Sequence, residues 1–525
     1  MMKARKLGTI ATLGASTAAI AMLTGLAGAR ADDLQLNQQL LNSRVDQLAA
    51  VGLNPGVGAV FSVDQGPAAG APVVAGSFPR SILIPGTDTS LKVYGQITEI
   101  LDYWLTGGDP NTSPQTTTVG INGQVQRIPL NNTAARARSN GIFSQSPRES
   151  KIGFETRTPT PFGEARTVME FDWAGSTAFY PGGGNPTGIS NNLGPRLRYA
   201  YGTLGGFLAG QATSNFSDPD ANSETLDFGG NAGDPGHVRI PQVRYTMPSY
   251  WGGSFSVSAE TPGTVIATGA GIQGSDAGVN PTVTTSCTVT ATGVATTCSS
   301  TLLTSGVTPV NVAKSSAPNF TAAWYMPQPW GHFDFSAVLL PSLVMDDGHF
   351  FSKQFVGYGG HIGMDIKPGW FGWAKDDFTF HVVGGDGLGT YVNSSSNFNI
   401  STNYGAPGSY GSFGGPTTAA SAALISATTA QIIGANAGYQ HWWLDNLRSN
   451  INGGWHSQFG VPIKLVGAAQ AAAINKEIFT AHANLIWNPV AFVDVGVEYT
   501  WGQRTVLNNS HATQNVLISK FAFRF

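Results

Sequence analysis

The sequence predicts an all-β fold: a transmembrane antiparallel β-barrel of about 16 strands that follows a short N-terminal helix. Three observations lead to this prediction. Segment after segment alternates apolar and polar residues with a period of two. The connections between these segments are short and long in turn. Charged residues make up only 11% of the chain, whereas about a quarter is usual in soluble proteins.

Residues 1–31 are expected to be a signal peptide. The basic start "MMKARK" is followed by an apolar run from Leu7 to Leu26, and Ala29 and Ala31 fit an A-x-A cleavage site before Asp32. After this segment no run of about 18 apolar residues exists, so no transmembrane helix is expected. The formal net charge of -3 gives no reason to expect a nucleic-acid partner. Two classes of exported protein agree with these observations: a secreted all-β scaffold and an outer-membrane barrel.

Residues 32–80 are assigned to a periplasmic helix and a linker. Leu34, Leu41 and Leu48 recur at heptad spacing, which predicts one amphipathic helix over residues 32–50. The helix is too short to be stable alone and needs a packing partner. Gly and Pro then interrupt the chain up to about Arg80, which is typical of a linker.

Residues 81–525 carry the strand pattern. Strands are expected near residues 91–105, 149–157, 164–173, 196–203, 207–213, 241–247, 255–260, 319–326, 332–340, 354–367, 377–387, 435–443, 448–458, 477–487, 492–502 and 516–525. Tight links such as "TPTPFG" alternate with long polar ones after Trp173, Thr213, Glu260 and Gly387. A barrel in one membrane has short turns at one rim and long loops at the other, whereas a soluble sandwich has no reason to alternate them.

The strands have one apolar and one polar face. In "ARTVMEFDW" the apolar face holds Met169, Phe171 and Trp173. In "PRLRYAYG" the pattern sets Leu197, Tyr199 and Tyr201 against Arg196 and Arg198. A single soluble strand with one wet face alternates in the same way, so only the repetition favours a lipid-facing surface.

The chain ends on "FAFRF". Phe521, Phe523 and Phe525 share one face, which we assign to lipid, and Lys520 and Arg524 share the other. An edge strand of a soluble sandwich has the same period, but the loop pattern favours the closing strand of a barrel. A terminal Phe on such a strand resembles the signal that the outer-membrane barrel-assembly machinery recognises.

Cys287 and Cys298 are the only cysteines, and both lie in "TTSCTVTATGVATTCSS". In an exported protein two nearby cysteines in one loop predict a local disulfide. Without neighbouring histidines they are too few for a zinc site.

Several ordered motifs resemble the DcaP-like porin family of bacterial outer membranes. They are "SFPRSILIPGTDTSLKVYGQI", "SKIGFETRTPTPFGEARTVMEFDW", "RLRYAYGTLGGFLAGQATSNFSD", "ETLDFGG" and "PQVRYTMP". The resemblance implies a homotrimeric barrel in the outer membrane, surrounded by lipid and lipopolysaccharide, with a periplasmic helical segment before it. It also implies passage of small anionic solutes, notably dicarboxylates.

A pore needs charges at fixed positions in a constriction rather than a catalytic group. By alternation, the basic residues that line the pore are Lys151, Arg157, Arg166, Arg196, Arg198 and Arg244. The planar fork of Arg binds carboxylates with two hydrogen bonds, which favours carboxylate solutes. The alternative is that these charges form neutralising pairs with acidic residues of the same wall.

The third long loop, "SNFSDPDANSETLDFGGNAGDPGHV", is expected to be acidic at the constriction, through Asp218, Asp220, Glu224 and Asp227. Opposite Arg196 and Arg198 it would create a transverse field. The spacing of its acidic residues also hints at a calcium loop, although Ser223 stands where that motif needs Gly. No metal or cofactor is expected.

Two other functions stay open. A barrel hydrolase would need Ser with His, or paired carboxylates with His, whereas the nine histidines are scattered. An adhesive or structural barrel would use the Ser-, Thr- and Gly-rich loops near residues 261–316 and 390–430. A channel without enzymatic activity is the prediction.

Overall fold

The structure is a computed structural model. It describes residues 74–108, 128–131, 133–175, 194–235, 238–268, 271–274, 284–289, 295–301, 312–348, 350–369, 372–392, 398–404 and 422–525. The expected signal peptide and the expected helix over residues 32–50 lie outside this part of the chain. Among the residues described, no helix has the length and apolar character of a membrane span.

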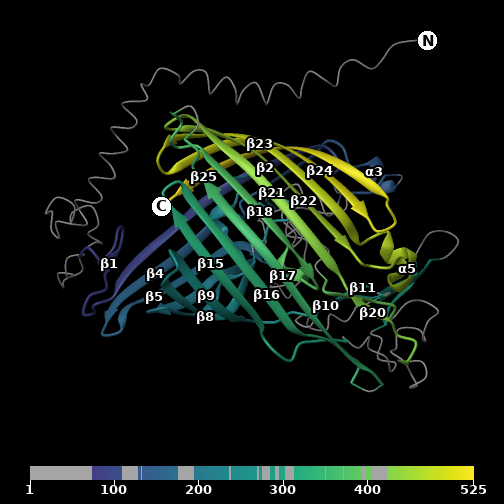
Figure 1. Cartoon of the computed structure of the whole chain (residues 1–525). Helices are drawn as coiled ribbons and strands as arrows, with labels where there is room; N and C mark the ends of the chain where they lie inside the picture. Colours follow the sequence, from purple (N-terminus) through teal and green to yellow (C-terminus); the bar gives the residue numbers. More distant parts are fainter. Residues whose placement is uncertain are drawn as a thin grey trace, which may run out of the picture.

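Sixteen antiparallel strands form a closed barrel (Figure 1). They are β2 (Ser90–Thr106), β4 (Lys151–Thr160), β5 (Gly163–Gly175), β6 (Gly194–Leu204), β7 (Phe207–Thr213), β8 (Arg239–Tyr250), β9 (Gly253–Glu260), β15 (Asn319–Gln328), β16 (Gly331–Asp346), β17 (Ser352–Ile366), β18 (Asp377–Asp386), β21 (Gln431–Leu444), β22 (Leu447–Phe459), β23 (Asn475–Val490), β24 (Val493–Val506) and β25 (His511–Arg524). Each expected strand is present, so the predicted barrel is confirmed.

The barrel closes between its last and first strands. β25 pairs with β2 in the register Gln96↔Arg524 to Trp104↔Val516. β2 pairs on its other side with β4, and β3 (Ile142–Ser146) continues that pairing beyond β4. Closure leaves no open edge among the sixteen strands, which is the condition for backbone to cross lipid as sheet.

The two rims differ. Tight turns join β4 to β5, β6 to β7 and β8 to β9 at one rim, where β1 (Ile82–Leu83) extends the sheet beyond β2. The opposite rim carries α3 (Ala134–Ala137) and α5 (Ile463–Ala471), and Figure 1 shows both at the end away from β1. The short-turn rim is therefore the periplasmic one.

A second sheet covers part of the long-loop rim. It consists of β11 (Gly271–Gly274), β10 (Val265–Thr268), β19 (Ile400–Thr402) and β20 (Ala427–Thr429). Ile266 and Ile400 of this sheet pack with Leu340 and Leu388 of the barrel side in one apolar cluster. The long loops are thus bound to the barrel end by their own core.

The two cysteines lie on a separate two-stranded hairpin. β12 (Thr284–Val289) pairs antiparallel with β13 (Ala295–Thr301), and Cys287 is directly opposite Cys298. Directly opposite residues of antiparallel strands have Cα atoms about 4.5–5.5 Å apart, which lies within the range of a disulfide. The disulfide stays a prediction.

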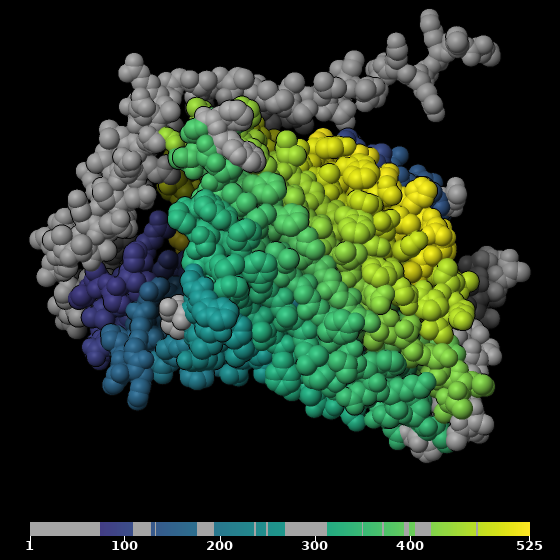
Figure 2. All heavy atoms as spheres, in the orientation of Figure 1, coloured from purple at the N-terminus to yellow at the C-terminus, as the bar shows by residue number. Residues whose placement is uncertain are grey.

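The outward face of the barrel is apolar. Large exposed side chains include Ile97, Met169, Tyr358, Phe521 and Phe523. The face in view in Figure 2 forms a continuous surface from the middle strands to the C-terminal ones. In a membrane this face contacts lipid, so its exposure has no solvation cost.

One face assignment from the sequence is wrong. On β6, Leu197 pairs with Phe171 while Tyr199 pairs with Glu170, so Arg198 is an extra residue in a bulge. The bulge reverses the alternation after Arg198. Tyr199 and Tyr201 therefore face the lumen together with Glu170 and Val168, rather than lipid.

Candidate functional site

The loop between β7 and β8, Ser214 to Val238 and hereafter loop 3, folds into the barrel. Its root is fixed by Glu260 at the end of β9. The Glu260 carboxylate accepts hydrogen bonds from Ser214 Oγ at 2.9 Å, from Asn215 N at 2.8 Å and from Tyr391 Oη at 2.9 Å. The Ser214 and Asn215 hydrogen bonds to this buried carboxylate hold the chain where it leaves the wall.

The first limb of loop 3 runs along β16 to β18. His332 Nε2 lies 2.7 Å from Asp218 Oδ2, and both residues are buried. Ser223 Oγ lies 2.7 Å from Thr379 Oγ1 on β18. Between these contacts the turn of η3 (Pro219–Ala221) leaves Asp220 exposed.

Glu224 attaches the middle of the loop to β22. Arg448 binds it with both ends of its guanidinium, Nη2 to Oε1 at 2.6 Å and Nε to Oε2 at 2.7 Å. The backbone oxygen of Glu224 accepts hydrogen bonds from Asn452 Nδ2 at 3.2 Å and from Asn484 Nδ2 at 3.0 Å. This segment is held through both its side chain and its backbone.

Glu498 of β24 holds the next turn. Its carboxylate accepts the backbone N–H of Leu226 at 2.7 Å and that of Asp227 at 3.1 Å. Leu226 packs in an apolar cluster with Ile100 of β2 and Ile518 of β25. Loop 3 thus reaches the strands where the barrel closes.

Asp227 lies in loop 3, between the spanning strands, and is only 5% exposed. Burial raises the pKa of its carboxyl to about 6, the nearby carboxylates of Glu498 and Glu149 act in the same direction, and His482 opposes them. Asp227 Oδ1 accepts Gly229 N at 2.7 Å, which shapes a tight turn.

The loop then returns across β23 to β21. Ala232 N donates to Thr480 Oγ1 at 3.0 Å. Gly233 has φ +74°, and a Cβ there would lie 2.3 Å from the backbone oxygen of Trp455, so the close approach requires glycine. The circuit ends where Ser214 N donates to Val238 O at 2.9 Å.

Loop 3 therefore covers the inner wall from β16 to β25 and also contacts Ile100 of β2. The strands β4 to β8 lie on the opposite side of the 16-stranded ring. Three of the four acidic residues proposed for the constriction, Asp218, Glu224 and Asp227, are used to attach or shape the loop, and Asp220 alone of the four is exposed. They do not form the acidic face opposite Arg196 and Arg198 that the sequence suggested, because the wall behind the loop offers them partners.

The wall of β5 and β6 carries an ion-paired cluster. Arg196 binds Asp172 with two hydrogen bonds, Nε to Oδ1 at 3.0 Å and Nη2 to Oδ2 at 2.5 Å. Arg198 binds Glu170 at 2.7 Å and Asp172 at 2.8 Å. For these two arginines the neutralising pairs that the sequence left open are present.

A second cluster lies nearer the periplasmic rim. Glu155 of β4 accepts Arg166 Nε at 2.7 Å and Arg157 Nη2 at 2.8 Å. Arg157 also reaches Glu164 at 3.3 Å, and the ring of Phe78 lies 4.5 Å from its guanidinium. This cluster has as many cations as carboxylates.

Three cations of the same wall have no ion pair among the residues that the structure describes: Lys151, Arg239 and Arg244. Arg239 Cζ lies 5.1 Å from the ring of Tyr199. The Nε atoms of Arg239 and Arg244 are buried and have no hydrogen-bond partner in the structure. Each side chain as a whole is half-buried, so a ligand can contact only the part of each guanidinium other than Nε.

The sequence did not reveal several of these residues. Arg239 was missed because it shares its strand face with Pro241 and Val243, which points outward by alternation. In the structure its guanidinium nevertheless lies over the ring of Tyr199, because Arg239 is at the end of the strand. Arg448 and Glu498 were recognised as strand residues, but nothing in the sequence pairs them with loop 3. The asparagines of "NING", on β22, are an unusual polar feature of that strand. They are the one feature of the sequence that could have indicated a contact with loop 3.

Histidines of the wall are not all single. His361 Nε2 lies 2.9 Å from His381 Nδ1, and Ser336 Oγ lies 3.0 Å from His361 Nδ1. All three are buried, and the ring of Phe216 from loop 3 packs on His361. They act as wall contacts under the loop. Ser336 is 7% exposed.

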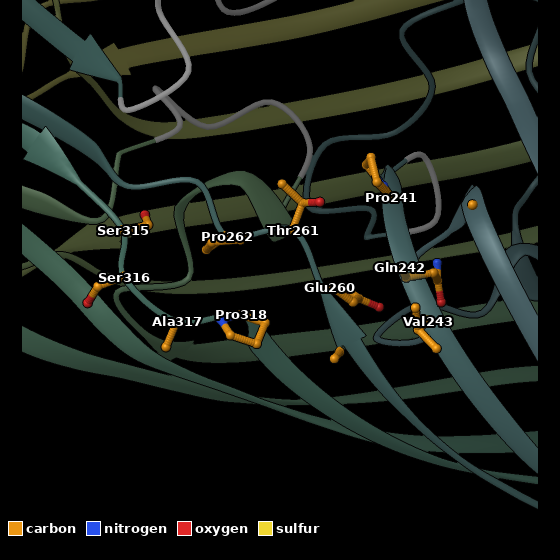
Figure 3. A pocket seen from close by; sticks show the side chains of 12 residues that line it. Pro241, Gln242, Val243, Glu260, Thr261, Pro262, Ser315, Ser316, Ala317 and Pro318 are labelled. Atoms are coloured by element: carbon orange, nitrogen blue, oxygen red, sulfur yellow. The ribbon is translucent and has the colours of Figure 1, made fainter.

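Two hollows lie outside the basic wall. One, of about 560 Å³, opens between the ends of β8 and β9 and the segment before β15 (Figure 3), and is lined by Gly210, Pro241, Gln242, Val243, Ala259, Glu260, Thr261, Pro262, Ser315, Ser316, Ala317 and Pro318. Another, of about 90 Å³, lies at the bend of loop 3 near Glu224, where Arg448, Lys520 and Arg524 meet Asp494. Its cations are paired, Arg448 with Glu224, Lys520 with Glu149 and Arg524 with Asp494.

The calcium alternative has no support in the described part of the chain. No group of three or more His, Cys, Asp or Glu side chains is placed there to hold a metal ion. Asp218 and Glu224, the first and last acidic residues of the suggested motif, are bound to different strands, β16 and β22. They do not converge on one point.

A closed barrel with a loop folded across its lumen is the architecture of a diffusion pore. A profile of the porin subfamily matches residues 82–516. The chain belongs to the porin subfamily. It is an outer-membrane channel of bacteria, and a comparison with curated protein sequences finds no match.

Among solved structures, this porin is similar to the outer membrane channel DcaP of Acinetobacter baumannii, with 21% identity, a TM-score of 0.57, and coverage of 83% of this chain and 97% of the other. At that identity the likeness concerns the fold. It is also similar to an anion-selective porin from Comamonas acidovorans, with 8% identity, a TM-score of 0.42, and coverage of 83% and 100%. Salmonella typhi OmpF in complex with daunomycin has 9% identity and a TM-score of 0.42, with coverage of 83% of this chain and 98% of the other.

Proposed function

We propose that this porin passes small hydrophilic solutes with a preference for anions, dicarboxylates among them, and works as a homotrimer. One observation carries the anion preference. The half of the inner wall that loop 3 leaves uncovered holds Lys151, Arg239 and Arg244 without carboxylate partners, while the carboxylates there, Glu155, Glu170 and Asp172, are paired with arginines. The passage between this wall and loop 3 has an excess of positive charge.

The chemistry of these groups favours carboxylates. A guanidinium offers two parallel N–H donors that match a carboxylate, and Lys151 adds a point charge. A solute with two carboxylates can contact two cations of the wall at the same time. Because the cations line a water-filled passage, each contact is weak enough to release the solute.

Loop 3 supports the same preference by what it does with its acidic residues. Against the far wall, Asp218 is bound to His332 and Glu224 is paired with Arg448. Had they faced the passage, they would have opposed anion entry. The homotrimer rests on the family resemblance, and the helix expected over residues 32–50 would assist it.

The test is the reversal potential of the purified porin in a planar bilayer under a potassium chloride gradient. A stable conductance with a potential that favours chloride is expected. A potential that favours potassium would contradict the anion preference, but the protein would still be a channel. A dicarboxylate such as succinate, added on one side, is expected to reduce the chloride current in a concentration-dependent way.

The homotrimer has a separate test. Native mass spectrometry of the detergent-solubilised porin is expected to give three chains per particle. A monomer after mild extraction, in a preparation that still conducts, would contradict the trimer and not the pore. A chain that lacks residues 32–73 would then test whether the N-terminal segment matters.

A further inference from the structure

We propose that Phe228 of loop 3 sets the width of the passage and the access of anions to Arg196. This inference rests on the proposed anion channel and assigns its specificity to a residue that charge patterns do not reveal. Arg196 belongs to β6, on the uncovered wall, and Phe228 belongs to the loop on the other side. The centre of the Phe228 ring lies 5.4 Å from Cζ of Arg196, a cation–π contact.

Loop 3 presents this ring from a rigid turn. Asp227 O accepts Thr225 Oγ1 at 2.9 Å and Gly230 N at 3.2 Å, and Asp227 Oδ1 accepts Gly229 N. Gly230 has φ +65°, which glycine adopts without strain. The turn is attached to β24 through Glu498. Phe228 follows directly, so its ring is carried by a fixed backbone.

Arg196 is held just as firmly on the other side. Its Nε and Nη2 atoms are engaged by Asp172, which is 1% exposed. The Arg196 side chain is still 40% exposed, and its Nη1 atom has no hydrogen bond among the described residues. The aromatic ring covers part of the guanidinium, so this free edge is the part that a solute can reach.

Two preorganised groups from opposite sides of the lumen therefore meet at one place. A solute must pass beside this contact, along the cations that remain accessible. The ring is apolar and half-buried, so it narrows the passage without adding a charge that attracts or repels ions. Size selection and anion contact are combined at a single point of the wall.

The experiment compares Phe228→Ala with the wild type in planar bilayers. Removal of the ring is expected to raise the single-channel conductance about twofold, because the passage is wider, and to raise the chloride preference, because the guanidinium of Arg196 is uncovered. Polyethylene glycols of graded size are expected to enter the Phe228→Ala pore at a larger size than they enter the wild type. Phe162→Ala is the matched control, since Phe162 lies in the β4–β5 turn and is 80% exposed; it should leave conductance unchanged.

If Phe228→Ala has the same conductance as the wild type, the inference about Phe228 is wrong, while the proposed anion channel is unaffected. Absence of conductance in the wild type would overturn the proposed function itself. Should the alanine variant fail to assemble, Phe228→Trp takes its place. The larger ring is expected to reduce conductance, and unchanged conductance in that variant would again overturn the inference.

Discussion

Gly95 of β2 and Phe525 at the end of the chain join the barrel at its periplasmic rim. They exchange both backbone hydrogen bonds, Gly95 N to Phe525 O and Phe525 N to Gly95 O, each at 3.1 Å. A Cβ at Gly95 would lie 2.4 Å from the backbone oxygen of Lys151 and 2.7 Å from Cζ of the Phe525 ring. The terminal aromatic residue therefore packs where the first strand has no side chain.

Replacing Gly95 by Val is expected to weaken barrel closure. The added atoms meet backbone, which has little room to move, so a loss of roughly 2 kcal/mol in folding stability is expected. The measurement is the temperature at which the folded band is lost when samples are heated before electrophoresis. Gly360→Val is the control, because a Cβ at Gly360 has no atom within 4 Å. Equal temperatures for both variants would contradict the role of Gly95.

Neutralising Lys151, Arg239 and Arg244 together as Gln is expected to lower the chloride-to-potassium permeability ratio roughly threefold, because unpaired charges dominate the field in the passage. The reversal potential under a salt gradient measures it. Lys375→Gln serves as the control, since Lys375 lies in the β17–β18 turn and is paired with Asp445. A permeability ratio that stays at the wild-type value would show that these three residues do not determine the anion preference.

Replacing Arg196 and Arg198 by Ser is expected to reduce both anion preference and stability. Asp172 and Glu170 are buried and would lose their partners. An uncompensated buried charge costs about 3 kcal/mol or more. Heat-dependent migration reports the loss. Asp172→Asn together with Glu170→Gln in the same chain should restore much of it, and no restoration would count against the ion-paired cluster.

Stability is expected to depend on pH through Asp227. Its carboxyl has a pKa of about 6 in the folded protein, above the value near 4 of an unfolded chain. Between these two values the folded protein holds a proton that the unfolded chain has lost, so stability falls as pH rises from about 4 to about 6. Asp227→Asn should remove this slope. The measurement is the unfolding temperature of the wild type and of Asp227→Asn at pH 4.5 and at pH 7.5. If the variant has the same pH dependence as the wild type, Asp227 is not its cause.

Cys287 and Cys298 are expected to form a disulfide. After denaturation without reductant, an alkylating reagent should label neither cysteine, and after reduction it should label both. Intact-mass measurement distinguishes the two results. Labelling without reductant would disprove the bond, and Cys287→Ser together with Cys298→Ser is expected to conduct like the wild type, because the hairpin lies outside the barrel.

Period-two patterning and loop lengths were sufficient to predict the barrel, its strand number and its closing strand. A lipid-facing wall imposes alternation on every strand, so this information is local and repeated. The motifs near "FPRSILIPG" and "RTPTPFGEAR" indicated the family from sequence alone. Most charges on β4 to β8 could likewise be assigned to the lumen, although Arg239 was missed. The bulge at Arg198 made the assignment of Tyr199 and Tyr201 wrong, because a one-residue insertion leaves no trace in composition.

Which charges are paired was decided by the tertiary structure alone. Glu224 and Arg448 are separated by more than two hundred residues of chain, and Phe228 meets Arg196 only because Glu498 holds the turn beside it. Such contacts depend on how a loop crosses a closed ring, and periodicity along one strand carries no information about a partner across the lumen. The sequence determined the wall of this porin, and the fold of loop 3 determined the passage inside it.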